Sequence, residues 1–150
     1  MSEVRVRPLS IRELETVLPL IADYQRFYGA PEPDLDHNRS FFLNFIAPSD
    51  AGELLGAWRD DELVGYACLY WSFSSVAAQP IVVLNDLFVS AANRGHGIGL
   101  ALIEAAREIA HQRGVTRLTW QTALDNRRAQ RLYERTGAAR SAWFEYELDA

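Results

Sequence analysis

The stretch 81–116, IVVLNDLFVSAANRGHGIGLALIEAAREIAHQRGVT, decides the fold, because it joins an apolar run, a glycine-rich turn and a long amphipathic segment. Residues 81–89 are too rich in β-branched, aliphatic and aromatic side chains for a solvated sheet face, and they predict a central strand. After the turn, apolar residues at helical spacing and the closing Gly114 predict a helix. The chain is therefore expected to pass from a buried strand through glycines directly into a helix.

Three glycines at alternate positions, Gly95, Gly97 and Gly99, form the turn before the predicted helix. Glycine adopts positive φ without strain and lets a ligand approach the main chain closely. Free N–H groups at a helix start, reinforced by the helix dipole, bind anions such as phosphate. A plain tight connection explains the glycines equally well, so the turn alone leaves both interpretations open.

Two common nucleotide-binding motifs do not fit this turn. No Gly-Lys-Ser/Thr follows it, as a triphosphate-binding loop requires, and the next predicted strand, 117–123, ends without the acidic residue of a dinucleotide fingerprint. After that strand comes the segment 126–137, NRRAQRLYERTG, which predicts a short helix with Asn126 at its start and Tyr133 near its end.

Together the two segments resemble the paired signature of the GNAT superfamily of acetyl-coenzyme A-dependent N-acetyltransferases. The resemblance covers residues 63–137, and 70–89 is similar to the diamine and polyamine acetyltransferase branch. Asn85 departs from that branch, because it stands where the branch has an acid. The matching pattern is Arg94-x-x-Gly97-x-Gly99 after a strand ending Asp86-Leu87-Phe88-Val89, then Asn126-x-x-Ala129-x-x-Leu132-Tyr133-x-x-x-Gly137.

The resemblance implies an α/β (α+β) fold, the GNAT acetyltransferase fold, and the length suits a single domain over residues 1–150. We expect a central mixed, mostly antiparallel, twisted sheet of about six to seven strands, splayed in the middle and flanked by about four helices. In this family the splay, often accompanied by a bulge, gives the central strand an open edge.

Shorter patterns predict the other elements. Alternating apolar residues near the N-terminus predict an edge strand, and a capping box at Ser10 and Glu13 starts a helix. Pro19 falls inside that helix, so we expect a kink there or two shorter helices. A second helix is expected from Asp34 or Asp36 as N-cap. Further predictions are a hairpin of strands 53–58 and 63–72, a long irregular loop over 72–80, and strands over 117–123 and 141–148.

For the acetyl donor, the resemblance implies binding of acetyl-coenzyme A along the glycine turn and the preceding strand. Main-chain groups of residues 95–100 would hold the pyrophosphate, and Leu87 and Val89 would pair with the pantetheine arm. An N–H near Leu87 or Phe88 would polarise the thioester carbonyl, while Asn126 would bind pantetheine and also cap its helix. The expected donor-binding set is Leu87, Phe88, Val89, Arg94, Gly95, His96, Gly97, Ile98, Gly99, Leu100, Asn126, Ala129 and Tyr133.

By the same resemblance Tyr133 is the catalytic general acid. Attack of an amine on a thioester expels a thiolate whose conjugate acid has a pKa near ~8.5, and a phenol of pKa near ~10 can protonate it. The alternative is a tyrosine that only packs its ring in the core.

The acceptor amine must lose a proton before it can attack, since an alkyl amine of pKa about 10.4 is almost wholly protonated at neutral pH. Asp86 is the first candidate to take that proton, through an ordered water, and to bind the substrate. By resemblance Glu145 also lies near the substrate, although a solvated strand residue would look the same. Tyr24, Phe27 and Tyr28 form either an aromatic wall of the acceptor pocket or part of the core.

Composition limits the partners. The net charge of −5 favours a cationic small-molecule amine as substrate and gives no general attraction for nucleic acid or an anionic membrane. The histidines show no metal spacing, so we expect no metal. The single Cys68 forms no internal disulfide and lies in an apolar strand, and the charged N-terminus is no signal peptide, so the expected location is cytoplasmic.

The motifs fit more than one function and more than one assembly. A protein or peptide N-acetyltransferase, or a non-catalytic coenzyme A-binding sensor, would carry the same motifs as a small-molecule enzyme. The aromatic C-terminal segment 143–146, WFEY, favours a homodimer in which this segment pairs or swaps across a two-fold axis.

Overall fold

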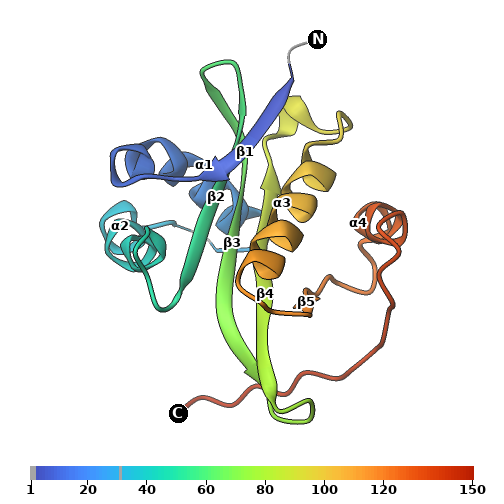
Figure 1. Cartoon of the computed structure of the whole chain (residues 1–150). Coiled ribbons are helices and arrows are strands. Elements are labelled where there is room, and N and C mark those ends of the chain that lie inside the picture. Colours follow the sequence, from blue (N-terminus) through green and yellow to red (C-terminus); the bar gives the residue numbers. More distant parts are fainter. Residues whose placement is uncertain (1–2, 31) are drawn as a thin grey trace.

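The computed structural model describes residues 3–30 and 32–150, and its centre is a five-stranded sheet with helices on both faces (Figure 1). The strands lie in the order β1-β2-β3-β4-β5. Neighbours from β1 to β4 run antiparallel, whereas β5 runs parallel to β4. The strands are β1 Val4–Pro8, β2 Gly52–Arg59, β3 Glu62–Ser74, β4 Gln79–Val89 and β5 Leu118–Thr119.

Helices α1 and α2 cover one face of the sheet, and α3 covers the other (Figure 1). One apolar cluster joins α1 and α2 to Leu54 and Tyr66, and a second joins α3 to Val64 and Val82. The central strands are therefore buried on both faces, which explains their nearly continuous apolar sequence. The helices are α1 Leu14–Phe27, α2 Leu35–Phe42, α3 Ile98–Gln112 and α4 Arg127–Glu134, with 3-10 turns at Ile11–Glu13, Leu43–Phe45 and Ala91–Asn93.

The N-terminal helices start where the sequence predicts. The Ser10 N–H donates to the Glu13 carboxylate at 2.9 Å, and the Asp34 carboxylate accepts from the His37 N–H at 3.1 Å. However, α1 runs through Pro19 as one helix, so the predicted alternative of two shorter helices is wrong. The apolar face of α1 buried against the sheet stabilises the helix despite the missing N–H.

Three strand predictions require correction. Strands β3 and β4 extend far into the expected loop 72–80 and leave only a short turn over 75–78. The expected strand 117–123 pairs over two residues only, because β5 meets β4 at Val82 and Val83 and nowhere else. Residues 141–148 form no strand in the single chain, since no other strand lies beside them. Within the described residues the sheet therefore has five strands rather than six or seven.

None of the helices in the described ranges has the length and apolar character needed to cross a bilayer.

Candidate active site

A bulge in the middle of β4 shapes the site. Cys68 pairs with Asp86, whereas the next residue on β3, Leu69, pairs with Leu84, so Asn85 is the extra residue on β4. An extra residue reverses the alternation of side chains between the two faces of the strand. As a result Asp86 lies on the α1 face, although the pattern of the preceding residues would have placed it on the α3 face.

The same strand has an open edge beyond the bulge. β4 and β5 pair only at Val82 and Val83, and none of the described strands pairs with residues 84–89 on that side. This is the splay that the family resemblance implies. A ligand with amide groups can therefore hydrogen-bond to this edge as an added strand.

Leu87 and Val89 supply the main-chain groups of that edge. The Ser90 N–H donates to the Val64 carbonyl on β3 at 2.9 Å, so regular alternation directs the N–H and C=O groups of Leu87 and Val89 away from β3. The Val89 carbonyl accepts from Nε of Arg94 at 3.1 Å. Arg94 thus ties the end of the strand to the adjoining glycine turn.

The glycine turn leaves free N–H groups at the start of α3. Gly95 and Gly97 have φ values of +83° and +79°, which other residues adopt only with strain, and Gly97 is the N-cap of α3. The first hydrogen bond within the helix runs from the Ala101 N–H to the Gly97 carbonyl at 3.0 Å. The N–H groups of residues 98–100 therefore have no acceptor within α3 and remain available to an anion.

Helix α4 is held against the start of α3. The side chain of Asn126 caps α4 by accepting from the Ala129 N–H at 3.2 Å, as the sequence predicts. A Cβ at Gly99 would come within 3.0 Å of Cδ2 of Leu132, so the two helices approach closely because this residue is glycine. This contact holds α4, which carries Tyr133, against the start of α3.

A cavity of about 390 Å³ opens between α1, the bulge of β4, the chain after β5 and α4. It brings together Tyr133, Glu145 and two of the three predicted aromatic residues, Tyr24 and Tyr28. Phe27 does not line it and is 60% exposed. The lining residues are Tyr24, Tyr28, Leu84, Asn85, Leu87, Trp120, Gln121, Thr122, Ala123, Tyr133 and Glu145.

Tyr133 is half-buried in the wall of this cavity, and its ring makes an edge contact with Trp120 at 5.5 Å between centroids. Burial raises the pKa of Tyr133 above its usual value, with a smaller contribution from Tyr28. The phenol therefore keeps its proton at neutral pH, which is the state that a proton donor requires.

Asp86 lies behind the cavity wall and does not line the cavity. Tyr66 donates its hydroxyl proton to Oδ2 of Asp86 at 3.2 Å, and Asn85 donates from Nδ2 to Oδ1 at 2.7 Å. Burial raises the pKa of Asp86, and these two hydrogen bonds oppose that rise. Tyr24 donates to the Asn85 carbonyl at 3.3 Å and thereby connects this polar group to the cavity wall.

Sequence reasoning missed several lining residues. Trp120, Gln121 and Thr122 were expected to be strand residues, but the splay of β5 turns them towards the cavity. Arg128 was also missed: its Nη2 lies 4.0 Å from the position of a Cβ at Gly95, so it sits beside the glycine turn. Its position in the first turn of α4, two residues after the Asn126 cap, is the sequence feature that could have indicated this placement.

The remaining sequence candidates lie outside the site. Cys68 is buried in the core, where burial raises the pKa of its thiol, and His96 is exposed in the glycine turn. In the parts of the chain that the structure describes, no group of three or more His, Cys, Asp or Glu side chains could hold a metal ion.

Comparison with known proteins identifies the class of protein. The model of the Acetyltransferase (GNAT) family matches residues 17–138. The chain belongs to this family and is an acetyl-coenzyme A-dependent N-acetyltransferase. It is similar to the uncharacterized N-acetyltransferase YhfO of Bacillus subtilis (strain 168), with 35% identity over 134 residues and 89% of each chain covered.

Other relatives support this assignment. The D-amino-acid N-acetyltransferase HPA3 of Saccharomyces cerevisiae is 30% identical over 132 residues, which cover 85% of this chain and 80% of the relative. The thialysine N-epsilon-acetyltransferase of Bos taurus is 36% identical over 76 residues, which cover 51% of this chain and 44% of the relative. A crystal structure of a probable acetyltransferase superimposes with a TM-score of 0.85 at 27% identity over 97% of both chains, which confirms the predicted fold. These relatives do not favour the non-catalytic sensor.

Proposed function

We propose that this enzyme transfers the acetyl group of acetyl-coenzyme A to the primary amine of a small cationic acceptor, such as a diamine, a polyamine or an amino-acid-like amine. The observation that carries the proposal is the cavity beside the open edge of β4. Tyr133 lines this cavity together with Tyr24, Tyr28 and Glu145. A protein or peptide acceptor is the alternative.

In this proposal the donor lies across the start of α3 and along β4. The N–H groups of residues 98–100 bind the pyrophosphate, and Arg128 adds positive charge beside them. Leu87 and Val89 hydrogen-bond the pantetheine arm, with Asn126 near its far side. Extended binding along this edge brings the thioester to the cavity, because Leu87 contributes to both the edge and the lining.

The acceptor is argued from charge and shape. Glu145 is the carboxylate among the described lining residues, and Asn85 takes the place of a second acid in the wall. One carboxylate and two tyrosine rings suit a compact amine with one additional cationic group. Two relatives are named for the acetylation of thialysine and of D-amino acids, which are also small amines.

The reaction needs three proton transfers, two from nitrogen and one to sulfur. The ammonium group first loses one proton, and the free amine attacks the thioester carbon and forms the new C–N bond. The nitrogen then loses its second proton to water as the C–S bond breaks, which leaves an amide and a thiolate. Asp86, behind the wall, accepts the amine proton through water, and its raised pKa makes it a stronger base than an exposed carboxylate. Tyr133 gives its proton to the departing thiolate and is later reprotonated from solvent.

A panel of amines assayed for coenzyme A release tests the proposal. The panel contains diamines, polyamines, lysine-like compounds, D- and L-amino acids, and peptides with free N-termini. The proposal expects the highest kcat/KM for a small cationic amine. If the peptides have the highest kcat/KM, the small-amine proposal is wrong and the acceptor is a protein or peptide.

Replacing Glu145 by Gln should raise the KM for the amine about tenfold and leave the KM for acetyl-coenzyme A unchanged, because the variant loses one charge-assisted contact with the cation. Glu147→Gln is the matched control, since Glu147 has the same charge and lies two residues away outside the cavity lining. Steady-state kinetics on both variants measures the difference. Equal amine KM values for the two variants would remove Glu145 from the site.

Replacing Asp86 by Asn should lower kcat/KM for the amine by about 100-fold at pH 7, the lower end of the range typical for loss of a general base. The loss should shrink as the pH approaches the amine pKa of about 10.4, where the free amine no longer needs a base. A pH–rate profile of both enzymes provides the measurement. A loss of the same size at every pH would show that Asp86 acts only through structure.

A further inference from the structure

Asn85 is the extra residue in the bulge of β4, and its side chain connects two other polar groups. Nδ2 of Asn85 donates to Oδ1 of Asp86 at 2.7 Å and to the hydroxyl oxygen of Tyr70 at 3.0 Å. In a regular strand the side chains of adjacent residues point to opposite faces, so residues 85 and 86 would be held apart. The bulge brings both side chains to the α1 face, where Tyr70 also packs.

These two acceptors fix the orientation of the Asn85 carboxamide. A carboxylate oxygen at 2.7 Å requires a donor, because an amide oxygen at that distance would repel it. The ring of Tyr70 stacks on Phe45 with 5.3 Å between the centroids, which keeps the second acceptor in place. The NH2 group of Asn85 is thus engaged by two partners, whereas its Oδ1 accepts no hydrogen bond from the described residues.

Asn85 also separates Asp86 from the cavity. Asn85 is exposed and lines the cavity, while Asp86 is 4% exposed and lies behind it. An amine in the cavity therefore meets the carboxamide before it can approach the carboxylate. The oxygen of a carboxamide accepts an N–H from an ammonium group and from a free amine alike, since both carry N–H donors.

The charge of Asp86 has no cation beside it. In the part of the chain that the structure describes, no arginine forms an ion pair with Asp86. Burial raises the pKa of every titratable group that faces it, so all of these groups are uncharged at neutral pH. The groups are Tyr66, Cys68 and Tyr70 on β3 and Tyr24 on α1.

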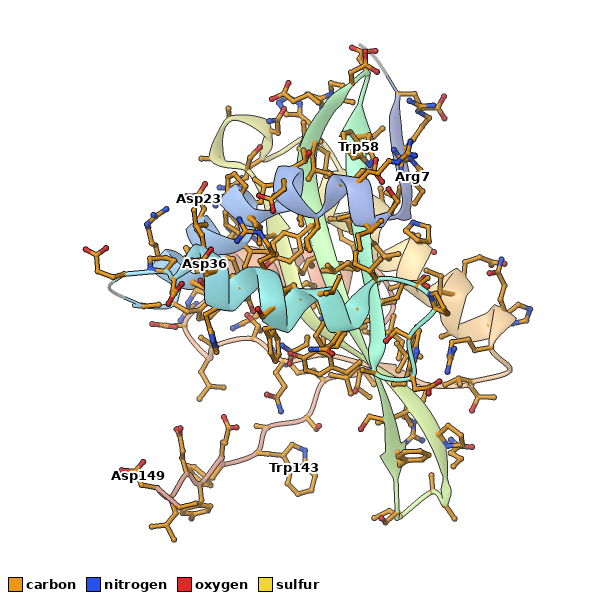
Figure 2. All side chains as sticks on the ribbon, turned by 90° about the vertical axis from the view of Figure 1, so that its left-hand side faces the viewer. Arg7, Asp23, Asp36, Trp58, Trp143 and Asp149 are labelled. Carbon is orange, nitrogen blue, oxygen red and sulfur yellow. The ribbon has the colours of Figure 1, made fainter. Side chains whose placement is uncertain are left out.

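The acidic residues of α1 and α2 do not reach this group either. Figure 2 shows Asp23 and Asp36 at the outer surface of the molecule, and they pair there with arginines at 3.0 and 2.7 Å. The ionised form of Asp86 is therefore stabilised by two hydrogen bonds, one from Asn85 and one from Tyr66. Both bonds lower the pKa of Asp86, and the bond from Asn85 is the shorter of the two, at 2.7 Å against 3.2 Å.

We propose that Asn85 links the acceptor amine to the base: its NH2 group holds the carboxylate of Asp86, and its Oδ1 accepts an N–H of the amine. The inference rests on the proposed function, in which Asp86 is the base. The first proton of the ammonium group passes to a water and from the water to Asp86, and Asn85 itself neither gains nor loses a proton. Because the carboxamide is neutral, it orients the reacting nitrogen without adding a second binding site for a cation.

Titration of the Asp86 carboxyl carbon by NMR tests the positioning role without any amine, and the spectrum of Asp86→Asn assigns the signal. The Asn85 N–H stabilises the ionised carboxylate, so its removal raises the titration midpoint. Asn85→Leu should raise it by about one to two pH units, the effect of one hydrogen bond to a charged group. Asn85→Asp should raise it at least as far, because two adjacent carboxylates share a proton.

Gln121→Leu is the matched control for this titration. Gln121 is another carboxamide in the wall of the same cavity, but the described side chains that bond Asp86 are those of Asn85 and Tyr66. The midpoint of Asp86 in Gln121→Leu should therefore equal that of the wild type. An Asp86 midpoint in Asn85→Leu that also equals the wild-type value would overturn the positioning role.

Steady-state kinetics on the two Asn85 variants tests the contact with the amine. Asn85→Asp keeps an oxygen on the cavity side, whereas Asn85→Leu removes it. At a pH above the raised midpoints Asp86 is ionised in both variants, so a difference in amine KM reports the oxygen. The amine KM should rise about tenfold in Asn85→Leu, which loses a charge-assisted hydrogen bond, and should not rise in Asn85→Asp. An unchanged amine KM in Asn85→Leu would overturn the contact.

The two measurements separate this inference from the proposed function. If the wild type acetylates no amine, the proposed function and the amine contact fail, and the titration alone decides whether Asn85 positions Asp86. If the wild type acetylates a small amine while Asn85→Leu changes neither the Asp86 midpoint nor the amine KM, the proposed function stands and the role of Asn85 is wrong.

Discussion

Replacing Tyr133 by Phe should lower kcat by about 100-fold at neutral pH, within the range typical for loss of a general acid. The hydroxyl is the proposed donor to the departing thiolate, and burial keeps it protonated because the pKa of Tyr133 is raised. Binding of acetyl-coenzyme A should change little, since the phenyl ring and its contact with Trp120 remain. Steady-state kinetics with calorimetric donor titration separates these effects.

Tyr28→Phe is the matched control for this variant, because it removes another tyrosine hydroxyl from the same cavity. Its kcat should stay within about threefold of wild type, the effect of one uncharged hydrogen bond or less. The raised pKa also predicts that wild-type activity persists above pH 10, because the acid is lost only when the phenol ionises. Unchanged kcat in Tyr133→Phe would reject the assigned role.

Replacing Gly97 by Ala should weaken acetyl-coenzyme A binding about tenfold or more, which corresponds to at least ~1.4 kcal/mol. Gly97 has φ +79°, and a Cβ added there meets no protein atom within 4 Å. The methyl group would therefore enter the open space through which an anion approaches the free N–H groups of residues 98–100. Calorimetric titration with coenzyme A measures the change.

Gly114→Ala separates this effect from backbone strain. Gly114 has φ +73° at the other end of α3, and a Cβ there also meets nothing within 4 Å. Both variants should lose about 1–2 kcal/mol of unfolding free energy, the usual penalty for a non-glycine residue in this conformation. Only Gly97→Ala should lose donor affinity. Equal affinities of the two variants would show that the glycine turn does not hold the phosphate.

The strand, the glycine turn and the helix of residues 81–112 were predictable because local sequence decides them. A run of apolar residues must be buried, and glycines permit the positive φ values that the turn requires. The caps at Asp34 and Asn126 were predictable for the same reason, since each depends on a hydrogen bond within three residues.

Features that depend on distant residues were not predictable. The bulge at Asn85 appears only when β3 and β4 are paired, and it moves Asp86 to the face opposite the one expected from alternation. Strand sequence in 117–123 and 141–148 does not form a ladder unless a neighbour is present to bond it. The cavity wall at Gln121 and Thr122 depends in turn on the splay of β5.

Continuity through Pro19 has a similar explanation. Local chemistry predicts a break at proline, but burial of one face of α1 against the sheet outweighs the loss of one hydrogen bond. Packing of α4 also places two residues that no local pattern indicates. Arg128 lies beside Gly95, and Trp120 contacts Tyr133.

A crystal structure with coenzyme A bound tests the central claim most directly. The account predicts phosphate oxygens within hydrogen-bonding distance, about 3 Å, of the N–H groups of residues 98–100. It also predicts the Tyr133 hydroxyl within about 3–4 Å of the sulfur, close enough for proton transfer. Phosphates bound away from the start of α3, or a phenol too far from the sulfur to reach it through one water, would contradict the account.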